Sequence, residues 1–166
     1  MQVPKSLKYR FLSQFVASLP GPKNSVQYPL MQPTDLENKN PFELHFGYQL
    51  QSWANDYVRI DVPLQDIHMN MYERPHGGVY TSLLDSVMGL CGFKSESFEG
   101  MRGGLTLSCT INFLAAPKDQ LLIGEGFRTG GGRNIYFAKG TVKDGLGNLL
   151  ATGTGTFRHR DLPAPK

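Results

Sequence analysis

The sequence has few of the features that mark metal-binding, secreted or membrane proteins. Its only two cysteines, Cys91 and Cys109, lack metal-site spacing and lie in apolar periodic segments, so we interpret both as reduced core residues. No apolar run approaches the roughly 18 residues of a membrane span, and the N-terminus lacks a signal-peptide core followed by a small-residue cleavage site. We therefore expect a soluble protein of the cytoplasm that holds no metal.

Charge of one sign is also scarce. The formal net charge is only +3, and Lys and Arg are scattered along the chain. This gives little support for nucleic-acid binding, although a local basic patch for an anionic cofactor stays open. At 166 residues, the chain is long enough for one well-packed domain and too short for two ordinary ones.

The first 40 residues differ in pattern from the rest. Apolar residues between Leu7 and Val16 recur at helical spacing, and Pro20-Gly21-Pro22 ends the expected short helix. We interpret 1–40 as a helical appendage on a domain spanning 41–160, with a short tail at 161–166. A helix lying on a membrane surface is the alternative for the appendage.

Strand patterns dominate after Phe42. Apolar residues alternate from Leu44 to Leu50 and again from Tyr57 to Val62, with the turn signal Asn55-Asp56 between the two runs. Further strands are expected over 105–114, 121–129, 134–143 and 149–158, and Asp144-Gly145 predicts a hairpin. One helix among so many strands predicts an α+β fold, an antiparallel sheet curled around that helix.

The one long helix is expected to begin near Gly77. Val79, Leu83 and Val87 form a buried face, while three glycines and one carboxylate share the opposite side: Gly78, Asp85, Gly89 and Gly92. Each glycine in a helix costs about 1 kcal/mol relative to alanine. We infer that another backbone or a ligand comes close to this face.

The first turn of this helix presents unpaired N–H groups at the positive end of the helix dipole, a suitable place for developing negative charge. The alternative is that Gly77 and Gly78 only make a tight turn. Gly77 and Asp85 are separated by about 12 Å of helix rise, too far for both to act on one carbon atom from a single chain. If both act, two antiparallel helices must meet across a twofold axis, and the glycine face would allow that approach.

Several motifs together resemble the hotdog-fold acyl-CoA thioesterases, and most closely the phenylacetate-degradation (PaaI-like) branch. The resemblance covers about residues 43 to 159 and rests on Asn70, His76-Gly77-Gly78, Leu83-Leu84-Asp85, Gly104-Leu105-Thr106, Thr110-Ile111-Asn112-Phe113-Leu114, Gly132-Arg133, Asp144-Gly145 and Ala151-Thr152-Gly153-Thr154-Gly155-Thr156-Phe157.

This resemblance implies hydrolysis of an acyl-CoA thioester at a site shared by two subunits. It assigns the Gly77 N–H to the oxyanion hole and Asp85 to general base or nucleophile. Asn70 would orient the attacking water or the thioester, and the Thr106 hydroxyl would assist Asp85. His76 is a secondary site residue, with a purely structural role as the alternative.

The resemblance also implies how coenzyme A is held. Arg133 matches the family's Gly-Arg position, and we group it with Gly78, Gly132 and Asn134 as substrate-binding candidates. Four other arginines are further candidates for the phosphate patch, although we favour solvated surface for them: Arg102, Arg128, Arg158 and Arg160. No separate cofactor is implied, because coenzyme A is part of the substrate. The expected assembly is a homodimer, with pairing of dimers into tetramers also open.

The acyl group cannot be read from the sequence. Tyr80, Phe93, Phe98 and Met101 suggest an apolar or aromatic chain without fixing its length. A non-catalytic acyl-CoA-binding protein is the alternative function, although the presence of Asp85 and Asn70 argues against it. A hydratase would place a catalytic His beside Asp or Glu in a different helix-entry motif, which is not found here.

Overall fold

The computed structural model describes residues 41–93 and 102–161. The predicted appendage and most of the predicted tail lie outside these residues. The elements are α3 (Pro41–His45), β1 (Gln49–Ala54), β2 (Tyr57–Pro63), the 3-10 turn η1 (Asp66–His68), α4 (Gly77–Leu90), β3 (Arg102–Phe113), β4 (Leu121–Gly131), β5 (Ile135–Asp144) and β6 (Leu149–Asp161).

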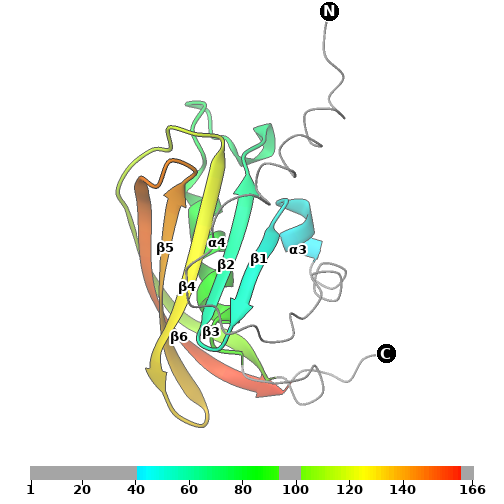
Figure 1. Cartoon of the computed structure of the whole chain (residues 1–166), viewed down its shortest axis with the longest axis vertical. Helices are drawn as coiled ribbons and strands as arrows, with labels where there is room; N and C mark the ends of the chain where they lie inside the picture. Colours follow the sequence, from blue (N-terminus) through cyan, green and yellow to red (C-terminus); the bar gives the residue numbers. More distant parts are fainter. Residues whose placement is uncertain (1–40, 94–101, 162–166) are drawn as a thin grey trace, which may run out of the picture.

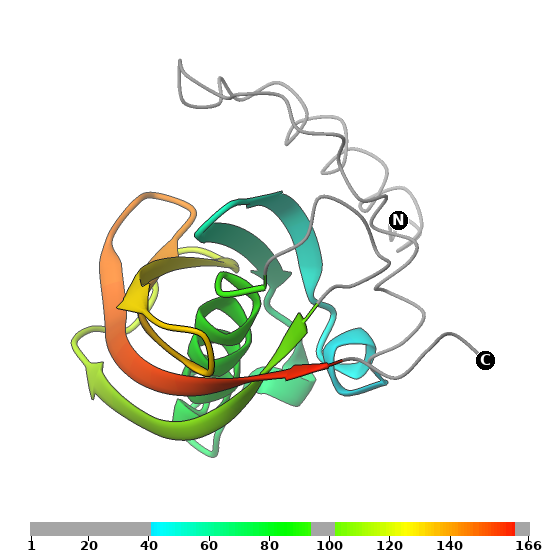
Figure 2. The ribbon, with the colours of Figure 1, turned by 90° about the horizontal axis from the view of Figure 1, so that it is seen from below.

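The six strands form one sheet in the order β1-β2-β4-β5-β6-β3, and every neighbouring pair is antiparallel. The sheet curls around α4, which lies on its concave side (Figures 1 and 2). This confirms the predicted α+β architecture. β1 and β3 are the two edges, so only these strands have a backbone row without a neighbouring strand in the described sheet.

The apolar face of α4 makes the centre of the core. Val79, Leu83 and Val87 are almost fully buried there, as their spacing predicts. β4 approaches the helix closely because Gly124 and Gly126 carry no side chain. A Cβ atom on Gly126 would overlap the backbone carbonyl of Val87.

The structure corrects the first predicted strand. Residues 41–45 form α3, and β1 begins only at Gln49. Pro41 stands at the first helical position, which suits its fixed φ, and Gly47 leaves the helical region with a φ of 66°. Phe42 and Phe46 are four residues apart and their rings lie 4.6 Å apart, a helical contact that the alternating pattern concealed.

Both predicted hairpins are confirmed. Asn55 and Asp56 connect β1 to β2, with Asp56 at a φ of 62°. Residues 145–148 connect β5 to β6, and the buried Asp144 carboxylate accepts hydrogen bonds from the N–H groups of Leu146 and Asn148. It also accepts one from the Lys118 N–H, so Asp144 ties this hairpin to the loop before β4.

The glycine face of α4 is occupied differently from the prediction. The Tyr136 hydroxyl donates to the Gly89 carbonyl, and the Tyr136 ring fills the space beside Gly92. Phe157 lies against Gly89, and its ring stacks on Tyr136 with centroids 5.1 Å apart. The predicted close approach exists, but aromatic side chains of the same chain make it, so Gly89 and Gly92 do not leave room for a partner helix.

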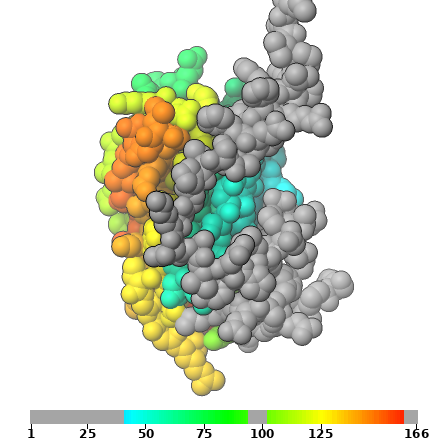
Figure 3. All heavy atoms as spheres, in the orientation of Figure 1, coloured from blue at the N-terminus to red at the C-terminus, as the bar shows by residue number. Residues whose placement is uncertain are grey.

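Two further observations complete the description of the fold. The β4–β5 hairpin projects beyond the body of the molecule, at the bottom of the space-filling view (Figure 3). Within the described ranges, no helix is both long enough and apolar enough to cross a membrane.

Candidate active site

One backbone N–H at the N-terminus of α4 makes no hydrogen bond within the described residues. His76 is the N-cap, and its Nδ1 accepts the Gly78 N–H at 2.9 Å, while its carbonyl accepts the Val79 N–H. The Gly77 N–H has no acceptor in the described part of the chain. Since Nδ1 is an acceptor, a neutral His76 carries its proton on Nε2. Gly77 N–H and His76 Nε2–H are thus both available to an incoming oxygen, whereas Gly78 N–H is not.

The loop before α4 is fixed around Asn70. Its Oδ1 accepts the N–H of Tyr72 at 2.8 Å and that of Arg74 at 3.3 Å, and its own N–H donates to the Arg74 carbonyl. Within this closed turn Glu73 has a φ of 57°, an unusual value for a residue with a side chain. Because the side-chain oxygen is used locally, the amide NH2 is the end of Asn70 that can reach a substrate.

Asp85 lies two turns further along α4 and is half-buried. Its Oδ1 accepts the Thr106 hydroxyl of β3 at 2.8 Å, so these two sequence-predicted residues do meet. Cys109, also on β3, lies 3.5 Å from the same oxygen. The prediction that both cysteines are core residues is correct for Cys91, which is fully buried, and wrong for Cys109, which is exposed beside Asp85.

Gly77 and Asp85 of one chain are separated by about 12 Å of helix, as their spacing predicts. Phe113, the last residue of β3, lies against the N-terminus of α4. Its ring is 3.6 Å from the position that a Cβ atom on Gly77 would take, and it also contacts the Tyr80 ring. A single chain therefore presents two half-sites, the Gly77 end and the Asp85 end.

The candidate coenzyme-binding residues Gly132, Arg133 and Asn134 form the exposed β4–β5 turn. The Arg133 carbonyl accepts an N–H from the Arg102 side chain at 3.0 Å, and the Asn134 carbonyl accepts the His159 N–H. This turn lies beside the C-terminal end of α4, because Tyr136 contacts both Gly89 and Gly92. Gly78 lies at the opposite end, about 20 Å along the helix, so one chain does not bring this set together.

The remaining arginines separate into two groups. Arg158 and Arg160 are exposed, as predicted for surface residues. Arg128 departs from that prediction, since its side chain is only 10% exposed and its Nη1 lies 3.3 Å from Asp56. Among the acyl-site candidates, Tyr80 is buried and Phe93 packs on Trp53, whereas Phe98 and Met101 lie outside the described residues.

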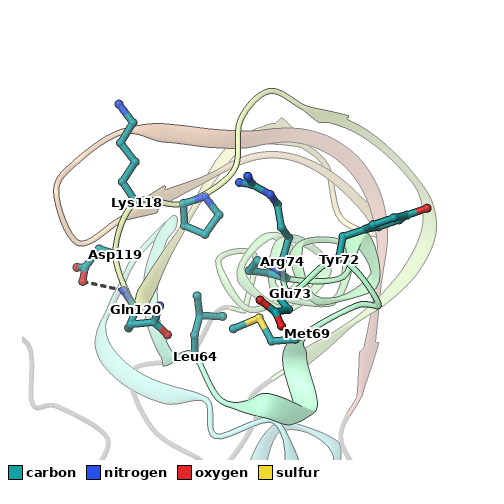
Figure 4. Close-up of a pocket in the computed structure, with 10 residues that line it drawn as sticks. Leu64, Met69, Tyr72, Glu73, Arg74, Lys118, Asp119 and Gln120 are labelled. Atoms are coloured by element: carbon teal, nitrogen blue, oxygen red, sulfur yellow. Dashed lines mark hydrogen bonds between the residues drawn. The ribbon is translucent and has the colours of Figure 1, made fainter.

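A pocket of about 340 Å³ opens beside the Asn70 loop (Figure 4). Its walls are the loop residues around Arg74, the segment from Pro117 to Gln120, and Leu64. None of the predicted catalytic residues lines it. In the described ranges no group of three or more His, Cys, Asp or Glu side chains is arranged to hold a metal ion.

No protein-family model matches the sequence, and no curated protein does. Solved structures do match the fold. A conserved protein of Pseudomonas aeruginosa is 27% identical with a TM-score of 0.68, over 76% of this chain and 99% of that one. A Streptococcus mutans protein bound to acetyl-CoA is 25% identical with a TM-score of 0.60, over 69% of this chain and 89% of that one.

The PaaI protein of the Escherichia coli phenylacetic acid degradation operon shares the fold at 15% identity, with a TM-score of 0.67 over 76% of this chain and 88% of that one. The curved six-stranded sheet around one long helix is therefore the hotdog fold, and the structures that this chain resembles are hotdog-fold thioesterase family proteins, PaaI among them.

Proposed function

We propose that this chain is an acyl-CoA thioesterase, which hydrolyses a thioester to a free acid and coenzyme A. The observation that carries the proposal is the arrangement on α4, where an uncommitted N–H at Gly77 precedes, by two turns, a carboxylate anchored by Thr106. These are the two elements that thioester hydrolysis needs: a donor for the oxyanion and a base or nucleophile. The acetyl-CoA carried by the Streptococcus mutans neighbour supports the substrate class.

The active unit in this proposal is a homodimer with two composite sites. The edge strand β3, which carries Thr106, supports this assembly, because it exposes Leu105, Leu107 and Phe113, each about half accessible. Pairing across this edge would bring Gly77 of one subunit to Asp85 of the other. Association of such dimers into a tetramer stays open.

In the composite site, the thioester carbonyl oxygen lies on the Gly77 N–H, with the Asn70 NH2 and His76 Nε2–H as additional donors. Asp85 of the other subunit takes the proton of a water whose oxygen attacks the carbonyl carbon. The tetrahedral intermediate then expels the coenzyme A thiolate, which takes that proton. In the alternative route, an Asp85 oxygen attacks the carbon itself and expels the coenzyme A thiolate, which leaves a mixed anhydride. Water then hydrolyses this anhydride to the free acid and the Asp85 carboxylate, and the proton released neutralises the thiolate.

Coenzyme A would be held by the projecting β4–β5 turn. Arg133 is exposed there and has no acidic partner among the described residues. Its guanidinium suits a phosphate, with Gly132 and Asn134 as backbone and amide donors. Because this turn is distant from Gly77 of its own chain, it would serve the site at its own Asp85 end. Gly78, whose N–H donates to His76, would offer no backbone donor to the coenzyme.

Asp85→Asn tests the proposal, since it removes the base and keeps the size of the side chain. We expect release of free thiol from a panel of short, long and aryl acyl-CoAs to fall at least about 100-fold. Asp66→Asn, which removes an exposed carboxylate on η1, is the matched control and should hydrolyse like the wild type. Unchanged turnover in the folded Asp85→Asn dimer would contradict the proposal. Binding of acyl-CoA without hydrolysis by the wild type would favour the non-catalytic alternative.

A further inference from the structure

β3 contains an irregularity directly opposite Asp85. In its pairing with β6, Thr106 faces Phe157 and Ser108 faces Thr156, so Leu107 is an extra residue on β3. In a regular strand, residues three apart point to opposite faces of the sheet. A bulge of one residue cancels that alternation, and bulges commonly re-aim side chains beside active sites. Thr106 and Cys109 consequently both face α4.

Both side chains converge on one atom. The Thr106 hydroxyl donates to Asp85 Oδ1 at 2.8 Å, and the Cys109 thiol donates to the same Oδ1 at 3.5 Å. A carboxylate oxygen offers about two lone pairs, so these donors fill Oδ1. Asp85 Oδ2 receives no hydrogen bond from any described residue.

We propose that Cys109 is a positioning residue for Asp85: with Thr106 it fixes Oδ1, and it leaves Oδ2 as the oxygen that accepts the proton or attacks the thioester. This inference rests on the proposed thioesterase function and goes beyond it by distinguishing the two oxygens. Cys109 acts through Asp85 and does not itself react.

The protonation state of Cys109 agrees with a donor role. Partial burial, the negative charge of Asp85 and the hydrogen bond to Asp85 together raise the pKa of the Cys109 thiol to about 11. The thiol therefore keeps its proton at neutral pH and is a poor nucleophile. Tyr48 and Tyr136 also feel the Asp85 charge, and burial raises the pKa of both phenols, so neither changes charge in an activity assay near neutrality.

Two substitutions distinguish a hydrogen-bond donor role of the Cys109 thiol from a packing role. Cys109→Val keeps an apolar side chain of similar size and removes the donor, whereas Cys109→Ser keeps a donor. We expect kcat of Cys109→Val to fall about fivefold, in proportion to one weak hydrogen bond to a charged group, with KM within twofold of the wild type. Cys109→Ser should keep most of the wild-type kcat, with KM again within twofold of the wild type.

The outcomes distinguish this inference from the function on which it rests. If Asp85→Asn abolishes hydrolysis while Cys109→Val keeps the wild-type kcat, the thiol only fills space and the positioning role is wrong. Equal losses in Cys109→Val and Cys109→Ser would also overturn it. If Asp85→Asn keeps hydrolysis, the proposed function itself fails.

A second measurement does not depend on turnover. In protein labelled with ¹³C at cysteine Cβ, the Cys109 resonance should titrate at a pKa of about 11 in the wild type and at lower pH in Asp85→Asn, where the neighbouring charge is gone. Cys91 is an internal control, because the charges that act on its buried thiol come from Asp56 and Arg128. An unchanged Cys109 titration in Asp85→Asn would contradict the contact.

Discussion

Replacing Tyr136 with phenylalanine would remove one oxygen atom from the centre of the fold. The ring would keep its contacts with Phe157 and His159, at centroid distances of 5.1 and 4.7 Å. The Gly89 carbonyl would lose the Tyr136 hydroxyl that it accepts near the end of α4. Leaving a buried carbonyl unpaired costs about 1–3 kcal/mol, and the Gly89 carbonyl is partly buried, so we expect the free energy of unfolding to fall by about 1–2 kcal/mol.

The assay is urea unfolding at one fixed protein concentration, followed by fluorescence of the single tryptophan, Trp53. Tyr57→Phe is the matched control. The Tyr57 hydroxyl donates to Glu125 at 3.1 Å on the other face of the sheet, but Glu125 also accepts from Lys143, so its carboxylate stays paired. We expect a loss below about 1 kcal/mol for this variant. Equal losses in the two variants, or a loss under about 0.5 kcal/mol for Tyr136→Phe, would refute the reasoning.

Two more predictions concern the sheet. Gly126→Ala should destabilise the fold by about 2 kcal/mol or prevent folding, because its Cβ would overlap the Val87 carbonyl, whereas Gly130→Ala, with open space around it, should unfold at nearly the wild-type urea midpoint. For Asp144, burial opposes ionisation, but hydrogen bonds from Lys118 and Asn148 outweigh it and lower the pKa to about 2. The stability that this carboxylate contributes is present above its unfolded pKa near 3.8 and is lost as pH falls towards 2. Asp144→Asn should therefore flatten the acid end of a stability-against-pH curve, and an unchanged slope would contradict this.

Sequence periodicity was sufficient to predict α4 and most strands, because each of these elements is a long segment with a single hydrophobic period and a clear boundary. The start of α4 was identified from Gly77, and the structure places it there. Residues 42–48 were misassigned because Phe42 and Phe46 satisfy helical spacing while Leu44, Phe46 and Tyr48 also alternate. In such a short segment, Pro41 and Gly47 were the better signals.

The site was only partly predictable from the sequence. The family resemblance allowed Thr106 and Asp85 to be paired. The exposure of Cys109 beside Asp85 depends on a bulge at Leu107, which no residue pattern in the sequence predicts. The partner of Gly92 was equally hidden. A glycine indicates that something approaches closely, and only the folded chain shows that it is Tyr136, 44 positions further along the sequence.

The position of β3 has a consequence for how activity depends on protein concentration. The donors to Asp85 come from an edge strand, whose other side lacks a strand neighbour in the described chain. In the proposed dimer, association therefore completes the site and also braces the strand that orients the carboxylate. Diluting the enzyme below its dimer dissociation constant should lower activity per mole of chain by mass action. The apparent rate constant should then report self-association directly, so that activity measured against enzyme concentration becomes a titration of the interface.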